Sequence, residues 1–160
     1  MKDSGHTSAK SPHDVVEALA DHEDAIGDLY AAFGLRFAPA ASFWQGLSAE
    51  EYGHGSLMRD LAGQPHELDV FVDTNRFPLA ELKAATRAVR DQIEVAENSS
   101  MTLLEALEIA LGFEEELIER DAYQAFGTDS SNVSRVLTHL RVSSERHRDA
   151  LRAYLQKIAR

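Results

Sequence analysis

Acidic and imidazole side chains interrupt several apolar helical stripes of this sequence. Five of them are candidate metal ligands, namely Glu23, Glu51, His54, Glu114 and His147. Each has apolar residues three, four or seven positions away, which is the spacing of one helix face. A buried carboxylate without a partner costs several kcal/mol, so sequences avoid this placement unless a cation or a proton neutralises the charge. The pattern therefore predicts that these side chains bind metal ions inside the protein.

The pair Glu51-x-x-His54 has a direct chemical interpretation. Residues three apart share a helix face, so the carboxylate and the imidazole can bind one ion or two neighbouring ions. These ligands suit iron, with manganese as the alternative, and the absence of thiolates disfavours structural zinc. We expect Glu51 and His54 to be catalytic if the protein is an enzyme. The competing interpretation is an exposed pair within one helix.

Alternatives stay open for two other candidates. In the run Glu114-Glu115-Glu116 the apolar stripe favours Glu114 as the inward residue, but Glu115 or Glu116 could turn inward instead. His147 has the alternative role of an ordinary histidine between helices, because no glutamate precedes it by three positions.

Other residues with polar groups are given structural roles. Tyr30 and Tyr123 are predicted to be core aromatics whose hydroxyl groups bond the carboxylates. His22 and His139 are predicted to lie at the surface, without a role in the metal site.

Five helices are predicted to position these side chains. Ser11 is a hydroxyl cap before a proline, Pro78 opens the third helix, and capping-box patterns begin at Ser42 and Thr102. The apolar periodicity then predicts helices over about 12–36, 42–62, 79–97, 103–126 and 132–160.

The order of these helices predicts an all-α four-helix bundle with a long crossover connection that carries an extra helix. We expect a disordered tail over residues 1–11 and one helical domain over 12–160. Residues 65–77 form the expected connection, with a small extended element at 70–72, and residues 127–131 form a turn.

Composition excludes several functional classes. The chain has 160 residues, with 16 Lys and Arg against 27 Asp and Glu, and a net charge of −11. That charge argues against binding to nucleic acid or to anionic membranes. The sequence shows no apolar run long enough to span a membrane and no signal-peptide core, so we expect a cytoplasmic protein. It contains no cysteine, which excludes disulfides and thiolate-held iron.

The chain resembles the rubrerythrin-like branch of the ferritin-like superfamily from about Asp14 to Leu155. The resemblance rests on the segments that carry the acids and histidines: Glu23 with Tyr30, Phe43-Trp44 before Glu50-Glu51-x-x-His54, Arg76-Phe77-Pro78-Leu79, and the stretch from Ala106 to Glu114. It implies a ferritin-like bundle with two non-haem iron atoms that react with peroxide or dioxygen, as in a peroxidase or ferroxidase. A homodimer is the expected assembly.

The same resemblance implies a role for each ligand. Glu23 would be a terminal ligand, Glu51 a bridging ligand and His54 a terminal ligand. Glu114 would be the opposing terminal carboxylate, and His147 the second imidazole. Electrons would come from a separate donor protein or from substrate iron, because the chain has no cysteine for a rubredoxin domain.

One departure from the family pattern concerns the last helix. Ser144 stands three residues before His147, where the family repeats its glutamate, and Glu145 points about 100° away around the helix. Leu117 replaces a further family carboxylate. We therefore expect one strong metal position and a weaker second one. The alternative is a degenerate bundle without catalysis, which acts as a metal-binding, sensor or protein-interaction module.

Overall fold

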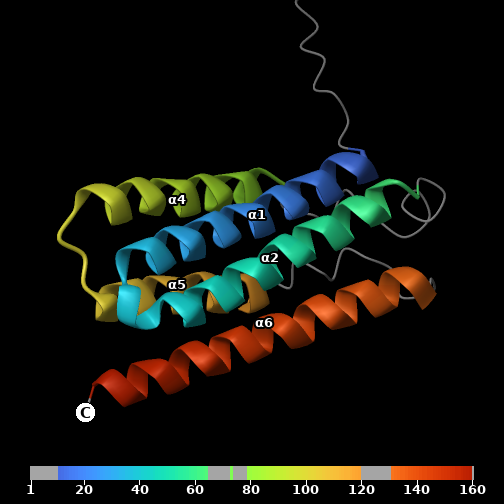
Figure 1. Cartoon of the computed structure of the whole chain (residues 1–160). Helices are drawn as coiled ribbons and strands as arrows, with labels where there is room; N and C mark the ends of the chain where they lie inside the picture. The colour runs from blue at the N-terminus through green and yellow to red at the C-terminus, as the bar shows by residue number, and fades with distance from the viewer. Residues whose placement is uncertain (1–10, 65–72, 74–78, 120–130, 160) are drawn as a thin grey trace, which may run out of the picture.

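The described part of the chain is helical. The computed structural model describes residues 11–64, 73, 79–119 and 131–159 (Figure 1). Its α-helices are α1 (Pro12–Arg36), α2 (Ala41–Ala62), α4 (Leu79–Asn98), α5 (Leu103–Glu119) and α6 (Ser131–Ile158), and a short 3-10 helix, η1 (Ala38–Ala40), joins α1 to α2. No strand occurs within these residues. The all-α prediction is confirmed, and the ferritin-like bundle remains a prediction.

Capping residues fix two helix starts as the sequence predicts. The Ser11 hydroxyl accepts the backbone N–H of Asp14 at 3.1 Å, and the Asp14 carboxylate accepts the backbone N–H of Ser11 at 2.9 Å. Thr102 and Glu105 make the same reciprocal pair before α5, at 3.2 and 2.7 Å. Each exchange satisfies two backbone donors that a helix start leaves without partners.

The predicted capping box at Ser42 is wrong. α2 begins at Ala41, and its N-cap, Ala40, has no side-chain hydrogen bond. The reason is the 3-10 turn of η1, in which the N–H of Ala40 donates to the carbonyl of Phe37 at 2.8 Å. This turn leads directly into α2, so Ser42 already lies inside the helix and cannot cap it.

Several predicted features lie outside the described residues. They are the tail before Ser11, the extended element at 70–72, the end of the fourth predicted helix beyond Glu119, and the turn before Ser131.

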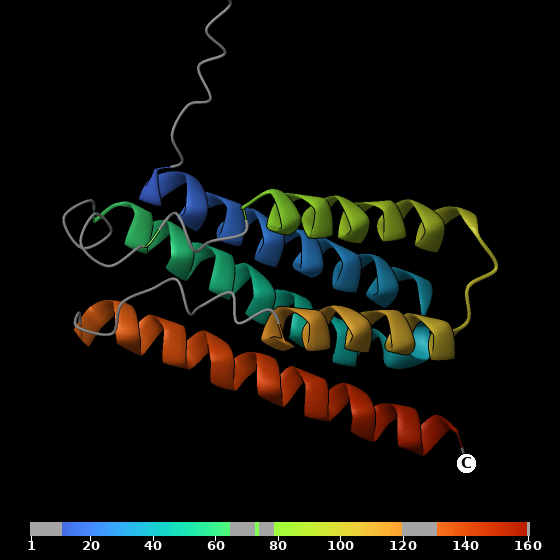
Figure 2. The same cartoon turned by 180° about the vertical axis from the view of Figure 1, so that it is seen from behind.

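Successive helices run in opposite directions. α1, α4 and α6 run one way, and α2 and α5 run the other (Figures 1 and 2). α1 packs against both α2 and α4, while α6 packs against α5 and α2. Four of these helices, α1, α2, α5 and α6, carry the candidate ligands, and α4 covers the outer side of α1.

The core consists of two apolar clusters. One contains buried residues from positions 15–20, 58–62, 79–82 and 133–140, and the other from positions 25–33, 40–47, 89–110 and 151. In α1, α2 and α6 the candidate ligands fall between the residues of these two clusters. The polar side chains therefore occupy a layer with apolar packing on both sides, which excludes water from them.

A glycine brings α1 and α2 close together beside this polar layer. A Cβ atom at Gly55 would lie 3.2 Å from the carbonyl oxygen of Ala20 and would collide with the carboxylate of Asp24. An added side chain would therefore force the Asp24 carboxylate to move and would press on the backbone of α1. The close approach sets His54 of α2 next to Glu23 of α1.

Candidate metal centre

The first ligand group joins α1 and α2. The Nδ1 atom of His54 lies 2.9 Å from Glu51 Oε2 and 3.4 Å from Glu23 Oε2. All three side chains are buried, with 1–2% of their surface exposed. The alternative of an exposed Glu51–His54 pair is therefore wrong, and the two residues face the bundle interior with Glu23.

The second ligand group joins α2, α5 and α6. The Nδ1 atom of His147 lies 2.6 Å from Glu51 Oε1 and 3.4 Å from Glu114 Oε1. Glu114 is buried, which confirms the register that the apolar stripe favours. Its neighbour Glu115 instead pairs with Arg152 at the surface.

Glu51 belongs to both groups. Its Oε2 atom faces His54 and its Oε1 atom faces His147. The two imidazole rings stack with centroids 5.6 Å apart and planes inclined by 24°. A single carboxylate thus lies between two histidines, and each group offers its own set of oxygen and nitrogen atoms.

Each group has the dimensions of a metal site. The candidate ligand atoms of each group all lie within 4.8 Å of one another. Metal–ligand bonds of about 2.0–2.2 Å put ligand atoms on opposite sides of one ion up to about 4.4 Å apart. Carboxylate oxygens and imidazole nitrogens are also the donors that iron and manganese accept. These buried groups could hold metal ions.

The Nδ1 atom of His147 gives a second indication. It is buried, and within the described residues it makes no hydrogen bond, although Glu51 Oε1 is only 2.6 Å away. The oxygen is close enough, but it does not lie in line with the ring N–H direction, so the short distance is not a hydrogen bond. A buried nitrogen crowded by carboxylate oxygens without a hydrogen bond fits a metal ligand.

Glu50 orients His147 from the outside. Its Oε2 atom accepts the Nε2–H of His147 at 3.0 Å and also contacts Arg146 and Ser143. With Nε2 held in this way, Nδ1 faces Glu51 and Glu114. Burial raises the pKa of Glu50, but its hydrogen bond with His147 and the neighbouring positive charges outweigh this effect and lower the pKa overall.

The sequence-based prediction did not assign Glu50 a role. The available signal is its place beside Glu51, because consecutive helix residues point about 100° apart and Glu50 can therefore face a different helix.

Tyr30 orients Glu114 by a hydrogen bond, as Glu50 orients His147. Its hydroxyl donates to Glu114 Oε1 at 2.7 Å, and the side chain is fully buried. Burial and the charge of Glu114 raise the Tyr30 pKa well above its ordinary value, so the hydroxyl keeps its proton. The prediction for Tyr30 is confirmed, and Tyr123 lies outside the described residues.

The two histidines of the centre favour their protonated, positively charged forms. Burial lowers the pKa of both histidines, but the neighbouring glutamates outweigh this effect and raise the pKa of His54 to about 9 and that of His147 to about 11. Burial raises the pKa of Glu23 to about 7. Two imidazolium ions therefore offset most of the carboxylate charge at neutral pH.

The structure corrects one histidine prediction. His22 is buried, and its Nδ1 atom lies 3.0 Å from the Thr86 hydroxyl of α4. Because α1 packs against both α2 and α4, more than one face of this helix is buried. A prediction from a single apolar stripe therefore places too many of its residues at the surface. His139 is exposed, as predicted, and its ring centroid lies 5.9 Å from that of His54.

A buried serine precedes His147 on the last helix. Ser144 is 3% exposed, one turn before His147 on the same face of α6. Glu145 is half-buried and pairs with Arg141 at 2.9 Å. The side chain of Leu117 lies outside the described residues.

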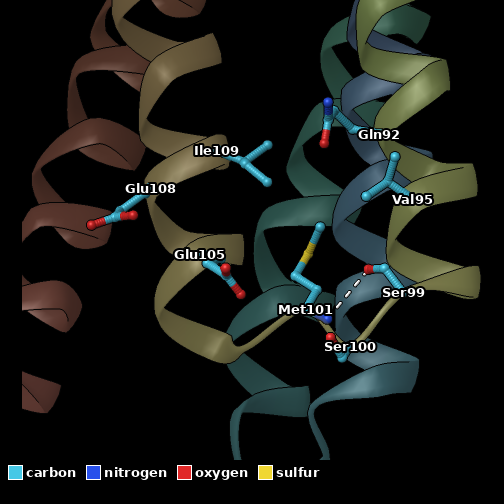
Figure 3. Close-up of a pocket in the computed structure, with 8 residues that line it drawn as sticks. All are labelled: Gln92, Val95, Ser99, Ser100, Met101, Glu105, Glu108 and Ile109. Carbon is cyan, nitrogen blue, oxygen red and sulfur yellow. Dashed lines mark hydrogen bonds between the residues drawn. The ribbon is translucent and has the colours of Figure 1, made fainter.

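A hollow of about 520 Å³ lies elsewhere, between α4 and α5 (Figure 3). Val95 of α4 and Ile109 of α5 point toward each other across it. The carboxylate of Glu105 is already held by Thr102 at the start of α5. None of the five candidate ligands lines this hollow, so it is separate from the candidate metal centre.

No helix within the described residues is long and apolar enough to cross a membrane.

Comparison with protein-family models, with curated proteins and with solved structures finds no match for this chain.

Proposed function

We propose that the protein is a rubrerythrin-like non-haem iron protein, which binds one or two metal ions in this centre and carries out redox chemistry linked to peroxide or dioxygen. The main support is the position of Glu51, whose two oxygens belong to two different buried ligand groups. Manganese is the alternative metal, because the same oxygen and nitrogen donors suit it.

Iron bound there would supply one-electron redox changes. Glu23, Glu51 and His54 would hold the first ion, and Glu114 and His147 would hold the second together with Glu51. The apolar layers on both sides exclude water and strengthen the electrostatic attraction between carboxylates and cations.

Two residues outside the ligand set have orienting roles in this proposal. The Tyr30 hydroxyl fixes one oxygen of Glu114, and Glu50 holds the Nε2–H of His147 so that Nδ1 faces the centre. A separate electron-donor protein or substrate iron would supply electrons. We further propose a cytoplasmic homodimer.

A second candidate function is supported by Ser144. Its buried hydroxyl is neutral, so three buried glutamates would have to offset the charge of two divalent ions. In this alternative the bundle binds one ion or none and serves as a sensor or protein-interaction module without catalysis. Consumption of peroxide by the iron-loaded protein would favour the first function, and tight metal binding without it would favour the second.

Calorimetric melting with and without ferrous iron under anaerobic conditions tests the proposal. An ion that binds only the folded state at about a hundred times its Kd stabilises by about 2.7 kcal/mol, which raises Tm by about 5–10 °C. Glu51→Gln should abolish this shift. Glu97→Gln, the same change at an exposed position of α4, should retain it. An unchanged wild-type Tm up to about millimolar metal would refute metal binding.

A further inference from the structure

A second cleft of about 230 Å³ lies on the other side of α1, where α4 packs against it. Its lining residues are Ala18, Asp21, Lys83, Thr86, Arg87 and Arg90. The three cationic residues follow one another at positions i, i+4 and i+7 of α4 and therefore share one helix face. None of the five candidate metal ligands lines this cleft.

Nearby acids compensate the positive charge of this cleft only in part, and the charge of Lys83 helps to lower the pKa of Asp14. Across the described ranges 11–64, 79–119 and 131–159, no hydrogen bond or ion pair joins Lys83, Arg87 or Arg90 to another residue. Among the lining residues that the structure describes, Asp21 is the one acid, which leaves a surplus of two positive charges against three cations, and its carboxylate also lies 3.5 Å from Arg59. Like charges one helix turn apart repel each other. The three side chains are exposed, so a dissolved anion can reach them, and a cluster of positive charge is notable in a chain of net charge −11.

The floor of the cleft is polar and already hydrogen-bonded. The Thr86 hydroxyl donates to the carbonyl of Leu82 at 2.9 Å, so it accepts from Nδ1 of His22 at 3.0 Å. Both side chains are buried. The floor is therefore held in place by its own hydrogen bonds, and the donors for an anion come from the ammonium and guanidinium groups above it.

We propose that this cleft binds a small soluble phosphate dianion, either inorganic phosphate or a phosphate monoester. The surplus of two positive charges matches a dianion, and guanidinium groups bind phosphate oxygens with paired hydrogen bonds. The volume is below the range of about 300–1,000 Å³ that drug-sized ligands occupy, which suits a phosphate group with little attached to it. Long polyanions are disfavoured because the rest of this acidic chain repels them.

Isothermal titration of the metal-free protein with inorganic phosphate tests this proposal. We expect saturable binding of one phosphate per chain, which weakens as salt is added. Arg87→Gln should weaken binding about tenfold or more, because it removes a charge-assisted hydrogen bond to the phosphate. Arg87→Lys keeps the positive charge and should restore part of the affinity. Arg135→Gln, which removes the same charge from an exposed position of α6, should leave the affinity unchanged.

Two further measurements identify which phosphate compounds bind and where they bind. Glycerol phosphate should bind like inorganic phosphate, and amide chemical-shift changes should centre on residues 83–90. Absence of saturable binding, equal loss of affinity in Arg87→Gln and Arg135→Gln, or binding only to vesicles that contain phosphatidic acid would overturn the proposal. Arg87→Gln should bind metal like the wild type, so failure here is distinct from failure of the proposed metal function.

Discussion

Metal binding by this centre should release protons, and the affinity should therefore rise with pH. The first position consists of Glu23, Glu51 and His54. Without metal, burial lowers the pKa of His54, but the neighbouring glutamates raise it to about 9, and burial raises the pKa of Glu23 to about 7. At about pH 7 this position therefore holds the imidazolium proton of His54, and Glu23 is partly protonated. A metal ion requires the deprotonated ligands, so the first ion should displace between about one and two protons.

The size of the effect follows from this proton count. Each displaced proton changes the affinity by about tenfold per pH unit, and Glu23 loses its proton between about pH 7 and pH 8. The first ion should therefore bind about tenfold to thirtyfold more tightly at about pH 8 than at about pH 7. Above about pH 9 the dependence should level off, because His54 has lost its proton before the metal arrives.

Calorimetric titration with manganese, in two buffers of different ionisation enthalpy, counts the released protons directly. Glu97→Gln should release the same number as the wild type, because this exposed residue lies outside both ligand groups. Equal affinities at about pH 6 and about pH 8, with no difference between the buffers, would refute the assignment of these residues as ligands.

Three further predictions concern single substitutions. Tyr30→Phe removes a hydrogen bond to the buried Glu114 carboxylate and should lower the free energy of unfolding by about 1–3 kcal/mol, measured by urea denaturation. Gly55→Ala should lower Tm because its Cβ meets the facing helix, whereas Gly46→Ala, with no atom within 4 Å of the added Cβ, should maintain or raise Tm. Ser144→Glu should increase the bound metal toward two ions per chain by elemental analysis, and two tightly bound ions in the wild type would contradict the expected weak second position.

Periodicity and capping residues predict most of the helical framework. Ser11 and Thr102 cap the helices that they are expected to cap, because their hydrogen bonds are local and need no information about the rest of the fold. Ser42 fails for a different reason. The 3-10 turn of η1 leads directly into α2, so this helix starts without a side-chain cap. The capping-box pattern at Ser42 does not reveal that turn.

The inward positions of the acids follow from their apolar neighbours, but their mutual contacts do not. Glu114 is buried as its stripe predicts, because burial of a helix face depends on local spacing. The contact of Glu50 with His147 and the burial of His22 against Thr86 depend on how two helices pack. Such packing joins residues far apart in the chain, so no spacing in the sequence encodes it.

Equilibrium dialysis against ferrous iron, followed by elemental analysis, tests the central claim most directly. The shared position of Glu51 predicts that wild-type protein retains at least one iron per chain, with a second ion held more weakly. Glu51→Gln should lose both ions, and Glu97→Gln should match the wild type. Wild-type protein without bound iron or manganese, or Glu51→Gln with the full wild-type metal content, would contradict the account.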